Sequence, residues 1–150
     1  MTEPITAPNA ERLKANHDVV ERFVATVNAK TYDALDELVH PDYVDHDPIP
    51  GQGPGIEGLK ASYRIFDGTF PDITFTLEDV VAEDDLVVAR GVLSGTNQGP
   101  FMGIPPTNRP MRWTATRMFR IRDGKISEGW LNIDMVGMLV QMGVIPPPPG

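Results

Sequence analysis

Apolar and polar residues alternate along much of the second half of the chain, which predicts a four-stranded antiparallel sheet. The alternation covers residues 73–81, 86–96, 111–121 and 126–134, and a period of two residues is typical of strands that bury one face. The sequence Arg122-Asp123-Gly124-Lys125 separates the last two runs, and Asp-Gly between two such runs is a strong hairpin signal. We therefore expect each strand to pair with the next one along the chain.

Apolar residues with helical spacing predict three helices ahead of the strands. The first starts at about Glu11, with Asn9 as its cap. Its apolar face consists of Leu13, Val20, Phe23, Val24 and Val27. A second short helix follows Lys30 and ends before Pro41, and a third covers about residues 56–66. Helices that precede a run of strands are typical of an α+β fold in which the helices cover one face of the sheet.

Glycine and proline mark the remaining segments as loops and tails. Residues 50–55 and 98–110 contain too much of both for a central strand, so we expect loops there. The two ends, residues 1–10 and 146–150, are expected to be loose tails. A last short apolar helix ends at Gly143, since glycine commonly terminates helices.

Length, charge and composition exclude several classes of protein. A chain of 150 residues suits one domain with an ordinary core, so we expect a single domain over residues 1–150. The net charge of −8 opposes nucleic-acid binding. No run approaches the ~20 apolar residues of a membrane span, and the N-terminus lacks the order of a signal peptide, so we expect a cytoplasmic protein without a membrane partner. The absence of cysteine excludes thiolate nucleophiles, cysteine-bound zinc and disulfides.

Two charged residues of the last hairpin fall among apolar neighbours. Arg117 shares one face of its strand with Trp113 and Phe119, and Asp134 is in line with Trp130 on the next strand. If both faces are on the same side of the sheet, Arg117 and Asp134 form a charged pair in an apolar wall. Such a pair is typical of a binding or catalytic site. The alternative is a partly buried ion pair without turnover.

The histidines offer one further candidate for chemistry. His46 lies between Asp45 and Asp47 in an expected loop, and loops on a rigid scaffold often carry functional side chains. It could be a second proton carrier, because its unperturbed pKa is close to physiological pH; the alternative is a loop residue that binds the backbone. Adjacent side chains in a proline-flanked loop seldom converge on one ion, so we expect no metal. His17, near the apolar face of the first helix, is expected to be structural.

As an ordered set, several short motifs resemble the SnoaL-like polyketide cyclases, members of the nuclear-transport-factor-2-like superfamily. The resemblance spans about residues 11–145. The motifs are Tyr43-Val44-Asp45-His46, Phe70-Pro71-Asp72, Gly95-Thr96, Phe101-Met102-Gly103, Pro106-Thr107, Phe119-Arg120, Asp123-Gly124-Lys125-Ile126, Trp130 with Asp134, Met138-Leu139 and Gln141-Met142-Gly143. Three positions depart from the family's pattern: Asn97 and Gly129 stand where relatives often carry histidine, and Arg117 stands where several carry a neutral or imidazole side chain.

The resemblance implies an α+β fold in which a cone-shaped, curved, mainly antiparallel sheet packs on three N-terminal helices as a cystatin-like α+β barrel. It also implies a deep apolar pocket inside the cone and a homodimer formed through the sheet. The implied activity is cofactor-independent ring closure, by aldol or related chemistry, of a hydrophobic polyketide-like substrate. Asp134 matches the aspartate that is the general acid and base in known relatives.

These observations together predict a set of site residues. We expect Asp134, His46 and Arg117 to be catalytic: Asp134 and His46 move protons, and Arg117 steadies an enolate or carbonyl oxygen. The residues expected to contact the substrate are Trp130, Trp113, Tyr43, Tyr63, Phe119, Asn132 and Met138. Two alternatives remain open. One is another reaction on the same scaffold, such as epoxide opening, hydration, hydroxylation or cycloaddition, and the other is a non-catalytic dimeric module that binds a small molecule.

Overall fold

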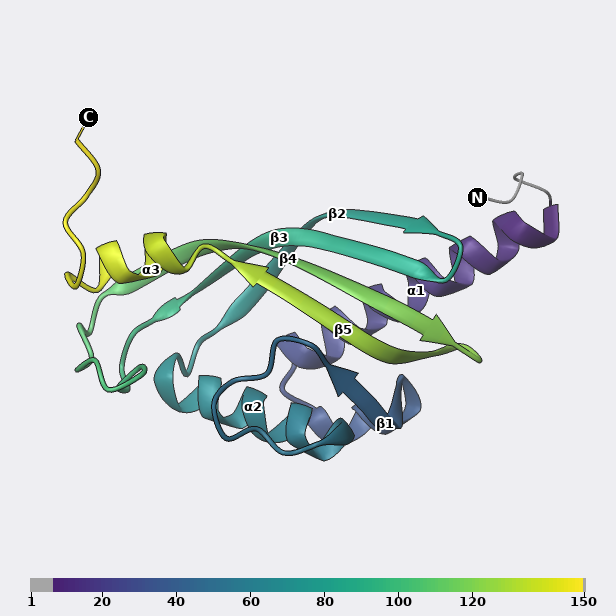
Figure 1. Ribbon diagram of the computed structural model, residues 1–150, viewed down its shortest axis with the longest axis horizontal. Coiled ribbons are helices and arrows are strands. Elements are labelled where there is room, and N and C mark those ends of the chain that lie inside the picture. The colour runs from purple at the N-terminus through teal and green to yellow at the C-terminus, as the bar shows by residue number, and fades with distance from the viewer. Residues whose placement is uncertain (1–6, 150) are drawn as a thin grey trace.

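The computed structural model describes residues 7–149, which fold into helices packed on one side of a curved sheet (Figure 1). The elements in chain order are α1 (Ala7–Asn28), the 3-10 helix η1 (Tyr32–Glu37), β1 (Val39–Asp45), α2 (Gly55–Thr69), β2 (Thr74–Glu83), β3 (Leu86–Thr96), β4 (Pro110–Arg122), β5 (Lys125–Ile133) and α3 (Met135–Gln141). The expected α+β class is confirmed. No helix in residues 7–149 is long and apolar enough to span a membrane.

The sheet has five strands in the order β1-β5-β4-β3-β2 and is not closed into a barrel. Strands β2 to β5 form the expected antiparallel meander, with the Arg122–Lys125 turn between the last two. Strand β1 was missed: it pairs in parallel with β5, at one edge of the sheet. Its Pro41 falls in the stretch between Val39 and Val44 where the pairing is irregular, and an edge strand tolerates proline because one side of it needs no partner.

The N-terminal helices differ from the prediction in their extent. Helix α1 begins at Ala7, so Asn9 is in its first turns and does not cap it. The first six residues of the expected tail lie outside the described residues. Proline at position 8 is compatible with this start, because the first turn of a helix needs no partner for its N–H groups. The second expected helix is only the short 3-10 helix η1.

Two apolar clusters hold the helices to the sheet. The larger joins α1, η1 and the start of α2 to the inner face of β3, β4 and β5, and includes Phe23, Leu59 and Phe119. The smaller lies toward α3 and includes Phe70 and Trp113. Helices α1 and α2 lie on the same side of the sheet (Figure 1), so a space that remains between them and the sheet is enclosed by both.

Asn97 organises the loop between β3 and β4. It is 1% exposed, and its amide nitrogen donates to the Gly99 carbonyl at 2.9 Å. Its amide oxygen accepts from the backbone N–H and the hydroxyl of Thr107, at 2.9 and 3.2 Å. Asn97 is therefore a structural residue of the loop.

Candidate functional site

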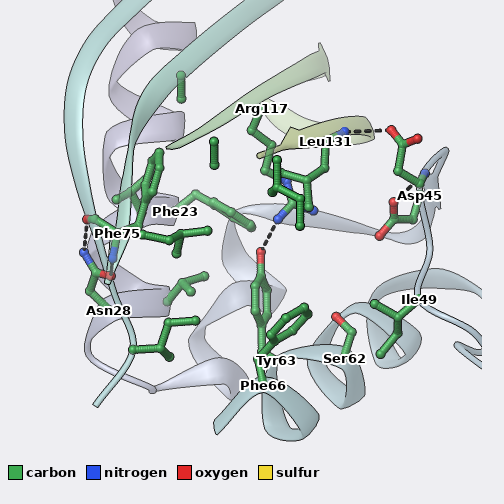
Figure 2. Close-up of a pocket in the computed structure, with 18 of the residues that line it drawn as sticks. Phe23, Asn28, Asp45, Ile49, Ser62, Tyr63, Phe66, Phe75, Arg117 and Leu131 are labelled. Atoms are coloured by element: carbon green, nitrogen blue, oxygen red, sulfur yellow. Dashed lines mark hydrogen bonds between the residues drawn. The ribbon is translucent and has the colours of Figure 1, made fainter. Parts of the chain in front are cut away.

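A cavity of about 120 Å³ lies between the helices and the inner face of the sheet (Figure 2). Most of its wall is aliphatic and aromatic, with side chains from α1, α2 and strands β2 to β5. The polar side chains in the wall include Asn28, Asp45, Asp47, Gln52, Ser62, Tyr63, Asp67 and Arg117. The cavity is smaller than the roughly 300–1,000 Å³ of typical small-molecule pockets, so a substrate with several rings fits only if the walls move apart.

Arg117 is the cation of this cavity. It lies on the inner face of β4, and its guanidinium carbon is 5.9, 5.9 and 5.5 Å from the ring centroids of Phe23, Tyr63 and Phe119. Its Nη1 donates to the Tyr63 hydroxyl oxygen at 2.8 Å, as Figure 2 shows. Among residues 7–149, no carboxylate forms an ion pair with Arg117, which leaves a charge surrounded mainly by aromatic rings.

The surroundings fix the protonation states of this pair. Burial lowers the pKa of Arg117, but Tyr63, Tyr43 and Asp45 raise it by more, so the net pKa lies above its ordinary value. Burial raises the pKa of Tyr63 to about 12, although Arg117 opposes this shift. At neutral pH the arginine is therefore charged and the Tyr63 phenol is neutral. Because the phenol oxygen accepts from Arg117, its O–H remains able to donate to another oxygen.

Two carboxylates close one side of the cavity, at the end of β1 and just after it. The Asp45 oxygens accept from the Asp47 backbone N–H and from the Gln52 amide, both at 3.0 Å. Asp47 accepts from the Leu131 N–H at 2.7 Å, and this bond is drawn in Figure 2. Asp45 is near enough to raise the pKa of Arg117 without an ion pair. Sequence reasoning missed Asp45 because it placed this residue in a loop. In a loop, the alternation of apolar and polar residues does not predict which side chains face the core.

Asp134 does not face this cavity, and the expected Arg117–Asp134 pair is wrong. The hairpin pairs Ile121 with Ile126, but Arg120 then pairs with Glu128, so Ser127 is an extra residue in β5. This bulge reverses the alternation that follows it. Leu131 and Ile133 consequently face the cavity, whereas Asn132 and Asp134 do not. The Asp134 side chain is exposed and caps α3 by accepting from the Gly137 N–H at 2.8 Å.

The same bulge places Trp130 and Asn132 on the outer face of the sheet. His46 also lies there: its ring stacks on Trp130, with centroids 4.5 Å apart, and its Nε2 is 2.8 Å from a Glu128 oxygen. Met138 belongs to α3 and is fully buried in the smaller apolar cluster. Of the predicted site residues, the cavity wall therefore contains only Arg117, Tyr63, Trp113 and Phe119. Tyr43 is buried beside Arg117, behind that wall.

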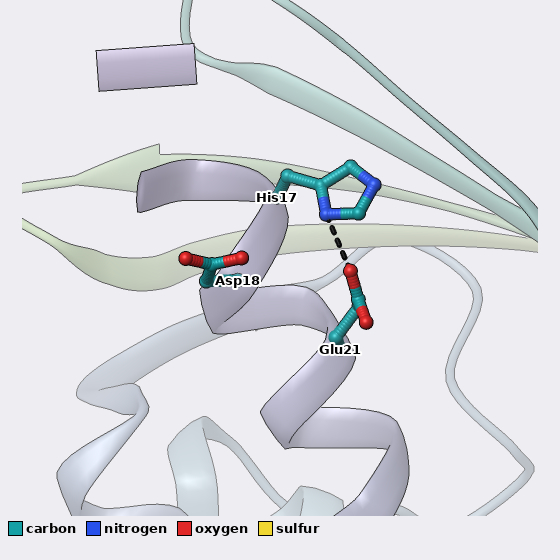
Figure 3. Close-up of side chains that lie close together, drawn as sticks. All are labelled: His17, Asp18 and Glu21. Atoms are coloured by element: carbon teal, nitrogen blue, oxygen red, sulfur yellow. Dashed lines mark ion pairs between the residues drawn. The ribbon is translucent and has the colours of Figure 1, made fainter. Parts of the chain in front are cut away.

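His17 lies outside the cavity wall, on an exposed side of α1. Its Nδ1 is 2.6 Å from a Glu21 oxygen one helical turn away, and Figure 3 shows this pair with Asp18 beside it. The potential ligand atoms of these three side chains lie within 4.8 Å of one another. Exposed groups on one helical turn often approach this closely without binding an ion, and the pair with Glu21 already accounts for the position of the imidazole.

Known proteins resemble this chain over most of its length. The family model described as SnoaL-like polyketide cyclase matches residues 17–142. A relative from Streptomyces nogalater, named nogalonic acid methyl ester cyclase, is 32% identical over 124 residues, which are 81% of this chain and 92% of the relative.

Solved structures show the same fold. TsrD from Streptomyces laurentii has a TM-score of 0.80 and 33% identity, over 88% of this chain and 97% of that one. Wild-type IdmH from Streptomyces antibioticus has a TM-score of 0.76 and 37% identity, over 86% and 99%. The expected nuclear-transport-factor-2-like architecture is confirmed by these neighbours.

Proposed function

Because the chain belongs to the family of SnoaL-like polyketide cyclases, we propose that it closes a ring in a hydrophobic polyketide intermediate, without a cofactor, inside the cavity described above. One observation carries the mechanism that we propose. The Asp45 carboxylate and the Arg117–Tyr63 pair border the same apolar space from different elements. A base and a group that stabilises negative charge are the two parts that an aldol ring closure needs.

The steps follow from these positions. Asp45, held by Gln52 and the Asp47 N–H, removes a proton from the carbon beside a substrate ketone, and the resulting enolate oxygen accepts hydrogen bonds from Tyr63 and Arg117. The enolate carbon then forms a bond to a second carbonyl carbon of the same chain. The alkoxide produced there takes the proton back from Asp45, so the product is an isomer of the substrate.

The apolar wall contributes by holding the two reacting carbons together, an effect that can remove up to about 7–11 kcal/mol from the barrier. The segment of residues 46–54 joins β1 to α2 and contains three prolines and two glycines. It carries Ile49 and Gln52 of the wall. We propose that this segment moves to admit a multi-ring substrate. The expected homodimer, cytoplasmic location and lack of nucleic-acid partners stay predictions.

The small volume of the cavity supports a second candidate, a module that only binds a small hydrophobic molecule. The two candidates differ in turnover. Wild-type protein freed of metal ions by a chelator is incubated with nogalonic acid methyl ester, the compound for which the relative is named. A ring-closed product of unchanged mass, separated by liquid chromatography and identified by mass spectrometry, supports the cyclase.

A matched pair of variants then tests the assignment of the carboxylate. We expect Asp45→Asn to lower turnover by about 10²- to 10⁴-fold, the usual contribution of a positioned proton carrier. Asp134→Asn is expected to leave turnover near the wild-type rate, because Asp134 lies outside the cavity wall and asparagine caps a helix as well as aspartate does. The reverse pattern would assign the chemistry to the carboxylate after β5 and end the proposal for Asp45.

A further inference from the structure

The Tyr43 hydroxyl is a buried polar group without a partner. Tyr43 is 2% exposed. Its hydroxyl oxygen and the Arg117 Nε are the two buried side-chain atoms that make no hydrogen bond within the described part of the chain. Buried hydroxyl groups are nearly always paired, since an unpaired one costs free energy. A phenylalanine would fill the same space without that cost, so the hydroxyl needs an explanation.

Gly129 provides the space for this hydroxyl. Asp45 of β1 pairs with Gly129 of β5, and the Tyr43 side chain crosses to the position where a side chain of residue 129 would begin. A β-carbon at that position would lie 2.1 Å from the Tyr43 hydroxyl oxygen and 3.1 Å from the ring carbon that bears it. The first distance is too short for a real contact, and the second is tighter than most real contacts. Glycine at 129 is therefore a condition for the position of Tyr43.

The neighbour of this hydroxyl is the cation of the cavity. Burial raises the pKa of Tyr43 most, Arg117 opposes the shift, and Tyr43 in turn helps to raise the pKa of Arg117. The strand pairing also brings them together: Gly129, over which the hydroxyl lies, pairs with Phe119, and Arg117 is two residues from Phe119 on the same face of β4. The phenol oxygen is therefore beside the guanidinium, without the geometry of a hydrogen bond. The oxygen end of the Tyr43 dipole stabilises a charge that has no carboxylate in contact with it.

We propose that Tyr43 is a positioning residue for Arg117: its hydroxyl, admitted by Gly129, holds the guanidinium beside Tyr63 where both can meet an anionic oxygen. This inference rests on the proposed role of Arg117 but not on that of Asp45. It explains why an unpaired hydroxyl is kept in the core. It also assigns a use to Gly129.

The first test measures thermal stability. Tyr43→Phe is expected to leave the Tm within about 2 °C of wild type, because the lost interaction with Arg117 is offset by the removal of an unpaired buried group. Gly129→Ala is expected to lower the Tm by about 2–10 °C through overpacking. The double variant is expected to recover most of that loss, since the closest clash disappears with the hydroxyl. Tyr32→Phe is the matched control: its hydroxyl donates to Asp67 at 2.6 Å, so the same substitution there is expected to lower the Tm.

The second test measures what a purely structural role would not change. The two probes are 2-hydroxy-1,4-naphthoquinone, which is a planar anion at neutral pH, and its neutral methyl ether. Binding is followed by quenching of the fluorescence of Trp113, which lines the cavity. Wild-type protein is expected to bind the anion at least about 10-fold more tightly than the ether. Tyr43→Phe is expected to lose most of this preference and Arg117→Met all of it.

Several results would overturn the inference. They are a Tm of Tyr43→Phe lowered as much as that of Tyr32→Phe, no loss of stability in Gly129→Ala, no anion preference in wild-type protein, or an unchanged preference in Tyr43→Phe. The cyclase proposal is tested by a different measurement, the turnover of Asp45→Asn, so its failure is distinguishable from these results. A Tyr43→Phe variant with full preference beside an inactive Asp45→Asn variant would remove only the role of Tyr43.

Discussion

Replacing Arg117 by methionine separates the catalytic use of the cavity's cation from its structural contribution. The variant loses one hydrogen bond from a charged donor, to Tyr63 at 2.8 Å, worth about 1.5–3 kcal/mol. It also loses contacts with three aromatic rings, each worth about 0.5–1 kcal/mol. Against these losses, the folded state no longer buries an unpaired charge, which costs several kcal/mol. Since the two sides are similar in size, we expect the free energy of unfolding to change by less than about 2 kcal/mol.

Catalysis is expected to respond differently. Removing one group that stabilises developing negative charge typically costs about 10²- to 10³-fold in kcat, so turnover should fall by that factor while the protein stays folded. Arg117→Lys is the control, because it keeps the charge but not the planar donor geometry, and it should be intermediate.

Thermal and urea denaturation give the free energy of unfolding, and the ring-closure assay proposed above gives kcat and KM. A Tm within about 4–8 °C of wild type, together with the loss of kcat, is the expected outcome. A loss of stability well above 3 kcal/mol, with activity falling only in step with the folded fraction, would show that Arg117 is structural and refute this reasoning.

Two further predictions concern the frame around the cavity. The Asn28 amide makes two hydrogen bonds of 2.9 Å to the backbone of Phe75 on edge strand β2. Asn28→Ala should therefore lower the free energy of unfolding by about 2 kcal/mol and the Tm, measured by calorimetry, by about 4–8 °C. A fall in Tm of only about 1 °C would mean that the edge strand finds other hydrogen-bond partners. The Thr96 backbone N–H and hydroxyl hold the pKa of Asp72 below its usual range, so this stabilisation is present above about pH 4 and is lost as the pH falls through the lowered pKa. The Tm difference between wild type and Asp72→Asn should therefore shrink on acidification, and a constant difference would contradict this assignment.

The parts of the fold that depend on local periodicity were predictable from the sequence. Strands β2 to β5 follow from alternation, and their hairpin follows from Asp123-Gly124. Arg117 was identified because a charge within an apolar run is visible without any knowledge of pairing, and it lines the cavity. Strand β1 was not predictable in the same way. It contains Pro41, and its partner β5 is more than 80 residues away in the chain.

The sequence by itself determined which residues alternate, where the chain turns and that a cation lies on an apolar face, because these are properties of neighbouring residues. Only the tertiary structure decided which carboxylate lines the same cavity as that cation. One extra residue in β5, Ser127, reverses the alternation and turns Asp134 outward, and the parallel pairing of β1 brings in Asp45 instead. Face and partner depend on the register between distant strands, and a register is fixed only when the whole sheet forms.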